Sequence, residues 1–144
     1  MKKSTITILM LCILLFPYCG KKNPTTPDIP SYIPDPEASF ILESSTQGYD
    51  EFGNCEITGT IKNVGKATGF NVMIEFQAYN ASDTIIDTAN GFPADLGKIP
   101  VGISATFEAS FFDTHSWSLI AKTTYEITWL TVAGVSMIQT GVVF

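Results

Sequence analysis

Three segments of this sequence alternate apolar and polar residues with a period of two, and this pattern restricts the possible folds more than any other feature. The alternation runs through residues 55–62, 70–79 and 103–111. An amphipathic helix needs apolar residues spaced by three and four positions, and these segments lack that spacing. Each segment is therefore predicted to be a β-strand with one buried face.

The remaining residues from 38 onward have the composition of further strands and short connections. Stretches rich in β-branched and aromatic residues predict additional strands over residues 40–46, 84–88, 125–133 and 135–144. Turn-forming residues predict loops over residues 48–53, 64–69 and 99–102. One or two helical turns are expected within residues 115–122.

Together these segments predict the fold class. About seven antiparallel strands in roughly 105 residues are typical of an all-β fold, an immunoglobulin-like antiparallel β-sandwich. We expect residues 38–144 to form this domain. The alternation directs the following side chains into its core: Ile57, Ile61, Phe70, Val72, Ile74, Phe76, Phe107, Ile127 and Trp129.

Residues 1–18 have the pattern of a secretion signal. Lys2 and Lys3 precede an apolar run over residues 6–16, which only Thr7 interrupts. A membrane-spanning helix needs about 20 apolar residues, so this run is too short to span and fits the apolar region of a signal peptide. The alternative, a buried N-terminal helix, does not account for the basic start.

Cys19 directly follows the signal and resembles the lipid-attachment cysteine of bacterial lipoproteins. The resemblance implies that the signal is cut before Cys19 and that acyl chains on its thiol anchor the protein to a membrane. Two or more such chains bind stably, at about 0.8 kcal/mol per buried CH₂. The preceding Phe16, Pro17 and Tyr18 stand where that signal has Leu and small residues. An unmodified Cys19 behind an uncleaved signal is therefore the alternative.

Residues 19–37 are predicted to be a tether between the anchor and the domain. Its prolines are Pro24, Pro27, Pro30, Pro34 and Pro36. Proline lacks a backbone donor and fixes φ, which excludes a helix or a central strand. In an extended polyproline geometry of about 3.1 Å per residue, residues 20–37 would reach on the order of 50 Å.

The domain also resembles the FxLyD family, small β-sandwich domains of prokaryotic envelope and secreted proteins. Residues 57–65 look like the strand of that family that ends in an Asn turn. Residues 72–80 look like its F-x-L-y-D strand: Phe76 and Tyr79 fit, while Ala78 replaces Leu and Asn80 replaces Asp. A third match places Leu96, residues 99–102 and Phe107 at its L-x-P-G turn and the following strand. The resemblance implies a fold and an envelope setting, with no catalytic residues to carry over.

Charge and reactive side chains exclude several functions. The chain has 8 Lys, no Arg and 14 acidic residues, for a net charge of -6. Such a chain is a poor partner for nucleic acid, whose phosphates attract clustered Lys and Arg. The single His115 has no nucleophile arranged with it in the predicted strands, so we expect a surface histidine and no enzyme activity. Cys55 is expected to be a small buried side chain without a disulfide partner.

Two weaker ligand sites remain as hypotheses. Asp50, Glu51 and Asn54 lie in a Gly-containing loop and could offer oxygen ligands to Ca²⁺, but they lack the spacing of a dedicated site, and a solvated turn is favoured. Exposed aromatic residues could bind a glycan, although core packing is favoured for them. The aromatic candidates are Phe112, Trp117 and Trp129.

The sequence therefore predicts a non-enzymatic, lipid-anchored envelope lipoprotein without a cofactor, whose β-sandwich is an interaction or structural module. A ligand-binding domain for Ca²⁺ or a glycan is the alternative. Expected partners are the membrane, through the anchor, and envelope proteins or glycans. The domain is expected outside the cytoplasm. Gly20 rather than Asp after Cys19 favours the outer membrane in a Gram-negative cell, by analogy with enteric lipoprotein sorting.

Overall fold

The structure, a computed structural model, describes residues 37–143 apart from the side chains of Asp95 and Leu96. These residues belong to the unit Pro34–Phe144. Cys19, the predicted signal over residues 1–18 and all of the tether except Glu37 lie outside the described residues. The structure therefore does not test the predictions made for these residues.

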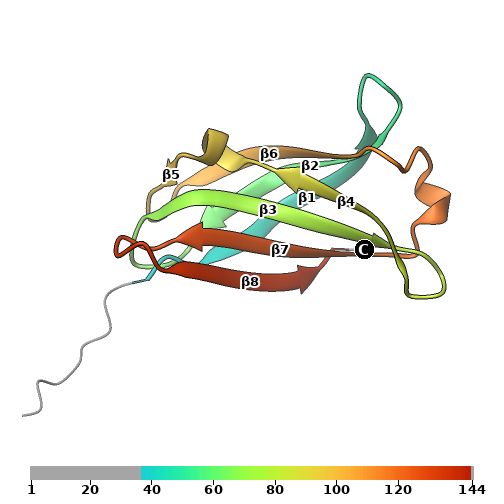
Figure 1. Ribbon diagram of the computed structural model, residues 1–144. Coiled ribbons are helices and arrows are strands. Elements are labelled where there is room, and N and C mark those ends of the chain that lie inside the picture. The colour runs from blue at the N-terminus through green and yellow to red at the C-terminus, as the bar shows by residue number, and fades with distance from the viewer. Residues whose placement is uncertain (1–36, 144) are drawn as a thin grey trace, which may run out of the picture. The chain divides into compact units, whose positions relative to one another are not determined.

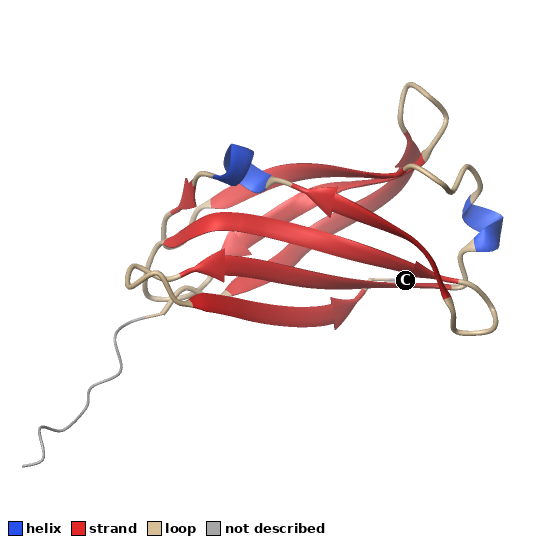
Figure 2. Ribbon diagram, in the orientation of Figure 1, coloured by secondary structure: helices blue, strands red, loops and turns tan. Residues whose placement is uncertain are grey.

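The regular secondary structure of the described chain is nearly all strand, as Figure 2 shows. The strands are β1 (Phe40–Tyr49), β2 (Cys55–Asn63), β3 (Gly69–Tyr79), β4 (Ile85–Gly91), β5 (Lys98–Ile99), β6 (Ser104–Phe111), β7 (Lys122–Leu130) and β8 (Ser136–Val142). Two short 3-10 helices, η1 (Pro93–Leu96) and η2 (Trp117–Leu119), interrupt them. The helical turns expected within residues 115–122 are thus a single short element, η2.

The strands form two antiparallel sheets that face each other, which confirms the predicted all-β sandwich (Figure 1). The smaller sheet has the order β1-β2-β6. The larger sheet has the order β4-β3-β7-β8, and the two-residue strand β5 also pairs with β3. The fourth strand therefore joins the sheet of β3 and β7, whereas antibody constant domains place it in the sheet of the first two strands.

Antiparallel pairing divides the connections between two ends of the sandwich. We call the end with the β1–β2, β3–β4 and β6–β7 connections the distal end, and the end where residue 37 begins the proximal end. In Figure 1 the C-terminal label lies toward the distal end. Backbone hydrogen bonds hold the start of the described chain at the proximal end, where the N–H of Val64 and that of Lys66 donate to the carbonyls of Ser39 and Glu37.

The core lies between the sheets and contains eight of the nine predicted side chains. Phe76 and Phe107 face each other from opposite sheets with ring centroids 5.5 Å apart, and Phe40 meets Trp129 edge-on at 5.1 Å. Such aromatic pairs contribute about 0.5–1.5 kcal/mol beyond the area they bury. Both layers of the sandwich therefore contribute to one continuous apolar interior.

The ring of Phe107 fits into the core because two positions beside it, Gly59 and Gly91, lack a side chain. A Cβ added at Gly59 on β2 would lie 2.8 Å from the ring of Phe107 and 2.3 Å from the backbone oxygen of Ser44. A Cβ at Gly91 on β4 would lie 3.1 Å from the same ring. The alternation of residues 55–62 thus places Gly59 inward for a steric reason, since the ring occupies the missing volume.

Phe70 is the predicted core residue that the structure places differently, because it is only half-buried. The pairing of β3 with β7 shifts between Phe70 and Met73, and Asn71 adopts a φ of 48°. An irregularity of this kind changes which face of the sheet the side chains before it occupy.

The predicted strand 103–111 begins one residue later than expected. Its first residue, Ile103, is 52% exposed because β6 begins only at Ser104.

A buried amide holds the proximal end together. Asn63, the last residue of β2, is fully buried, and its Nδ2 donates to the carbonyls of Ala67 at 2.8 Å and Ile99 at 2.9 Å. Its Oδ1 accepts hydrogen bonds from the N–H of Gly65 at 3.0 Å and of Ser39 at 3.4 Å. One side chain therefore joins the start of the domain, the β2–β3 loop and β5.

Candidate functional site

The distal end gathers most of the residues that the sequence singled out within the domain. Asp50, Glu51 and Asn54 lie in the β1–β2 turn, and Phe112 and His115 lie in the β6–β7 connection. These two connections are neighbours, because Cys55 at the start of β2 pairs with Phe111 at the end of β6. The N–H of Cys55 also donates to the carbonyl of Thr114 at 2.9 Å.

The β1–β2 turn is organised around the Asp50 carboxylate. Its Oδ1 accepts the backbone N–H groups of Phe52 and Asn54, each at 2.9 Å, and its Oδ2 accepts Asn54 Nδ2 at 2.8 Å. Desolvation raises the pKa of Asp50, but the hydrogen bonds from Asn54 and Phe52 outweigh it, so the pKa lies below the ordinary value. These contacts account for the predicted candidates Asp50 and Asn54 as parts of a rigid turn.

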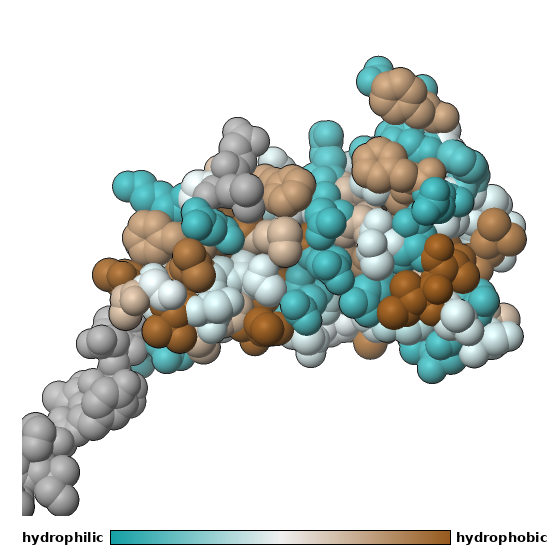
Figure 3. Space-filling model, in the orientation of Figure 1, coloured by the Kyte–Doolittle hydropathy of each residue, from teal (hydrophilic) through white to brown (hydrophobic). Residues whose placement is uncertain are grey.

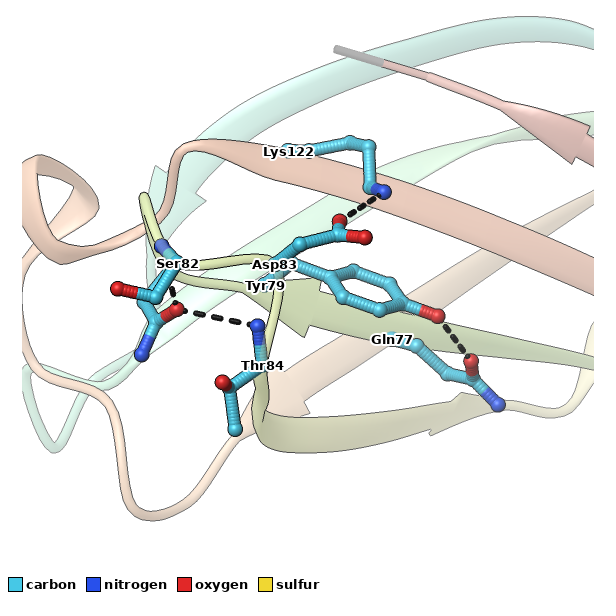
Figure 4. Close-up of polar contacts among 7 residues, drawn as sticks. Gln77, Tyr79, Ser82, Asp83, Thr84 and Lys122 are labelled. Atoms are coloured by element: carbon cyan, nitrogen blue, oxygen red, sulfur yellow. Dashed lines mark hydrogen bonds and ion pairs between the residues drawn. The ribbon is translucent and has the colours of Figure 1, made fainter.

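The β3–β4 turn at the same end repeats this arrangement with Asn80 in place of Asp50. Asn80 Oδ1 accepts the N–H groups of Ser82 at 2.9 Å and Thr84 at 3.1 Å, the residues two and four positions later (Figure 4). In both turns the residue three positions later has a positive φ, 81° at Gly53 and 58° at Asp83. Asp and Asn stabilise such turns through their own side chains. This correspondence was not predicted from the sequence, although the spacing from Asp50 and Asn80 to the residues two and four positions later is the same in both turns.

A row of polar contacts leads from the β3–β4 turn along the outer face of the larger sheet. Lys122 on β7 forms an ion pair with Asp83 and lies 4.3 Å from the ring centroid of Tyr79. The Tyr79 hydroxyl donates to Gln77 Oε1 at 2.8 Å, and Gln77 Nε2 donates to Glu75 Oε1 at 3.0 Å. Figure 4 shows the side chains of Gln77 and Tyr79 from β3 and of Lys122 from β7 on one face.

The outer face of the larger sheet is hollowed, and the hollow is lined by both polar and apolar groups. A shallow cavity of about 330 Å³ lies over β3, β7 and β8. It is lined by Gln77, Thr124, Tyr125, Glu126, Thr140, Gly141 and Val142. In the space-filling view of this side, hydrophilic residues cover the centre and apolar groups lie toward its ends (Figure 3). Hydroxyl, amide and carboxylate groups could hydrogen-bond a polar ligand here.

Two phenylalanines project from the distal end into solvent. Phe52, at the tip of the β1–β2 turn, is 77% exposed, and Phe112, directly after β6, is 72% exposed. Tyr49 and Leu119 at the same end are also exposed. Exposed aromatic side chains are enriched in protein–protein contacts, because they bury a large area at a low cost in conformational entropy.

The aromatic residues predicted as a glycan platform do not share one surface. Trp129 is buried in the core against Phe40, and of the three only Phe112 is exposed, at 72%. Trp117 is half-buried: it meets the ring of Phe111 edge-on, and its Nε1 donates to the carbonyl of Gly48 at 2.8 Å. Packing therefore accounts for both tryptophans, as the sequence favoured.

The reactive candidates of the domain are separated from one another. Cys55 is fully buried, and burial followed by the charge of Asp87 raises the pKa of its thiol. His115 is exposed in the β6–β7 connection.

Within residues 37–143, no group of three or more His, Cys, Asp and Glu side chains is placed to hold a metal ion. The helices of this part of the chain are too short to cross a membrane.

The comparisons with known proteins give a distant structural similarity. No protein-family model and no curated protein matches the chain. The archaellum periplasmic stator protein FlaG from Sulfolobus acidocaldarius is similar at a TM-score of 0.41 and 14% identity, covering 73% of this chain and 100% of that chain. A second similarity is to DesR, a β-glucosidase from Streptomyces venezuelae, at a TM-score of 0.38 and 14% identity. It covers 74% of this chain and 15% of that chain. The FxLyD resemblance stays a prediction.

Proposed function

We propose that this chain is a non-enzymatic lipoprotein of the bacterial cell envelope, anchored through Cys19, whose β-sandwich is an interaction module. The observation that carries the proposal is the division of the sandwich between its two ends. The chain joins the domain at the proximal end, where Ser39 is hydrogen-bonded to the β2–β3 loop. Phe52 and Phe112 project from the opposite end.

This arrangement supports display of the distal end away from a membrane. A tether over residues 19–37 would enter the domain at the proximal end, where Glu37 lies, and Phe52 and Phe112 lie at the other end. The Asp50 carboxylate accepts one hydrogen bond from the backbone N–H of Phe52 and two from Asn54, which orders the backbone that carries the Phe52 ring. We expect the distal end to contact another envelope component.

Palmitate labelling tests the anchor. Cells that produce the chain are fed radiolabelled palmitate, and label is expected on the wild type and on Cys12→Ala but not on Cys19→Ala. Cys12 is the matched control because it lies in the predicted signal. An unlabelled wild type, or equal label on Cys19→Ala, contradicts the anchor.

Capture from the native envelope tests the interaction surface. The double variant Phe52→Ala/Phe112→Ala is expected to lose a partner that the wild type captures. Val132→Ala is the control, because Val132 is 76% exposed at the proximal end. If all three proteins capture the same partners at the same yield, the distal end is not the contact surface.

A glycan-binding domain is the second candidate, favoured by the exposed rings of Phe52 and Phe112. Calorimetry with fragments of envelope glycans distinguishes it: heat of binding that disappears in the double variant supports it. The Ca²⁺ version of the same alternative is tested by titrating Ca²⁺ into the protein, and the absence of heat removes it.

A further inference from the structure

The connections at the distal end carry acidic residues and no basic ones. These connections, residues 50–54, 80–84 and 112–121, contain neither Lys nor Arg. Their acidic residues are Asp50, Glu51, Asp83 and Asp113. The connections at the proximal end contain one acidic and one basic residue. Negative charge therefore gathers at the end of the sandwich that also exposes two phenylalanine rings.

Two of these acidic side chains already have partners. Asp83 forms an ion pair with Lys122, and Asp50 accepts three hydrogen bonds within its own turn. Glu51 and Asp113 are exposed, and in the described part of the chain their carboxylates form no ion pair or hydrogen bond. Both carboxylates are therefore available to a partner.

Each available carboxylate belongs to a chain neighbour of an exposed ring. Glu51 directly precedes Phe52, and Asp113 directly follows Phe112. The two phenylalanines are 77% and 72% exposed. A cationic side chain is attracted both to the face of an aromatic ring and to a carboxylate. The distal end thus presents both groups that attract Lys or Arg, at two places.

The same end already binds a lysine of this chain through a ring and a carboxylate. Lys122 Nζ lies 4.3 Å from the ring centroid of Tyr79, and it forms an ion pair with Asp83 (Figure 4). Among the described residues, no lysine lies over the ring of Phe52 or of Phe112. The contact that is filled within the chain at Tyr79 is therefore open to a partner at the two exposed phenylalanines.

We propose that the distal end docks a protein that presents Lys or Arg side chains to Phe52 and Glu51 and to Phe112 and Asp113. The inference rests on the proposed function, because it names the partner chemistry of the surface proposed there. Charge complementarity favours this occupant, since an anionic surface would be repelled by the acidic connections. Arg suits the site better than Lys, because its guanidinium group is planar, is less strongly hydrated and stacks on aromatic rings.

A peptide of defined charge tests the recognition. The purified full chain in nonionic detergent is titrated with a fluorescent peptide of alternating Arg and Ser, and with the same peptide in which Gln replaces Arg. The Gln peptide is expected to bind at least about fivefold more weakly than the Arg peptide. Added salt should weaken the binding of the Arg peptide alone. Equal binding of the two peptides, or no binding of either, overturns the proposal.

Matched carboxamide variants test whether the binding depends on the position of the charges. Glu51→Gln/Asp113→Asn should weaken the Arg peptide at least about fivefold. Glu37→Gln/Glu108→Gln removes the same charge from two other exposed positions, and should weaken the peptide less than about twofold. Equal losses in the two double variants would mean that the peptide responds only to net charge, and the proposal would be wrong.

A ring variant tests the aromatic part of the site. Phe52→Leu/Phe112→Leu keeps two apolar side chains but removes both rings, so it should weaken the Arg peptide at least about threefold. An unchanged affinity contradicts the role of the rings.

Capture from the native envelope separates this inference from the proposed function. Glu51→Gln/Asp113→Asn should lose the partner that the wild type captures. If this variant keeps a partner that Phe52→Ala/Phe112→Ala loses, the distal end is a contact surface but its partner is not recognised through Lys or Arg. If Phe52→Ala/Phe112→Ala also keeps the partner, the proposed contact surface is itself wrong.

Discussion

Replacement of Asn63 by alanine should destabilise the domain more than most single substitutions. The side chain makes three hydrogen bonds of 2.8 to 3.0 Å, to Ala67, Ile99 and Gly65, from a fully buried position. Each contributes about 1 kcal/mol net, and the Ile99 carbonyl is left buried without this donor, so the expected loss is about 3 kcal/mol. That is a large part of the roughly 5–15 kcal/mol that stabilises a domain.

Urea unfolding of residues 34–144, followed by the fluorescence of the buried Trp129, measures this loss. Asn90→Ala is the control, because Asn90 is exposed on β4 and should change the stability by less than about 0.5 kcal/mol. If Asn63→Ala loses no more than Asn90→Ala, the side chain does not hold the proximal end together and the reasoning is refuted.

Asn63→Asp examines the direction of the hydrogen bonds. The substitution keeps an acceptor for Gly65 but replaces the donor by an oxygen that faces two carbonyl oxygens. Burial and these oxygens should raise the folded-state pKa of the new carboxyl group above its unfolded value. The penalty should therefore be largest at neutral pH and shrink as the pH falls through the folded pKa. A penalty that grows on acidification would contradict the assigned donors.

Three further predictions use the same unfolding assay or a simple reaction. Gly59→Ala should cost about 2 kcal/mol, because its Cβ would lie 2.3 Å from a backbone oxygen, while Gly48→Ala, in open space, should cost less than about 0.5 kcal/mol. Alkylation of Cys55 should be at least about a hundredfold slower in the folded protein than in urea, since the thiol is buried and its pKa raised. The stability difference between the wild type and Asp50→Asn should shrink as the pH falls through the lowered pKa of Asp50, because that stabilisation requires the ionised carboxylate. A difference that does not depend on pH would contradict this role, and Glu51→Gln in the same turn is the control.

The alternation of side chains predicted the fold well wherever strands run without interruption. Ile57, Phe76 and Ile127 are all fully buried at the positions that the period of two assigned to the core. This success has a simple cause: successive side chains of a strand point to opposite faces, so burial of one face imprints the period on the sequence. The strand pattern alone therefore sufficed for the fold class.

The same rule failed where the backbone departs from regular pairing. The prediction for Phe70 assumed that the alternation continues through Asn71, but the positive φ of Asn71 interrupts it. Asn tolerates this conformation better than most residues, so its presence permits the irregularity without requiring it. Neighbouring strands decide whether it forms, and a single sequence does not specify those neighbours.

The candidate surfaces were predictable only in part, and for a related reason. The Asp50 and Asn80 turns could have been found from an Asp or Asn followed by hydrogen-bonded residues two and four positions later, because those contacts are local. The exposure of Phe52 and Phe112 depends instead on which connections share an end of the sandwich. Strand order decides this, and so the sequence alone, although it placed Trp129 in the core, did not predict that Phe52 and Phe112 are exposed at one end.

The place of β8 at the edge of the larger sheet, among the described strands, follows from the same dependence on strand order. Residues 135–144 were predicted to be a strand from their composition, and an uncharged apolar strand is ordinary in the middle of a sheet, where both edges are paired. The topology places this strand at an edge, where the same composition leaves backbone groups and Ile138 exposed.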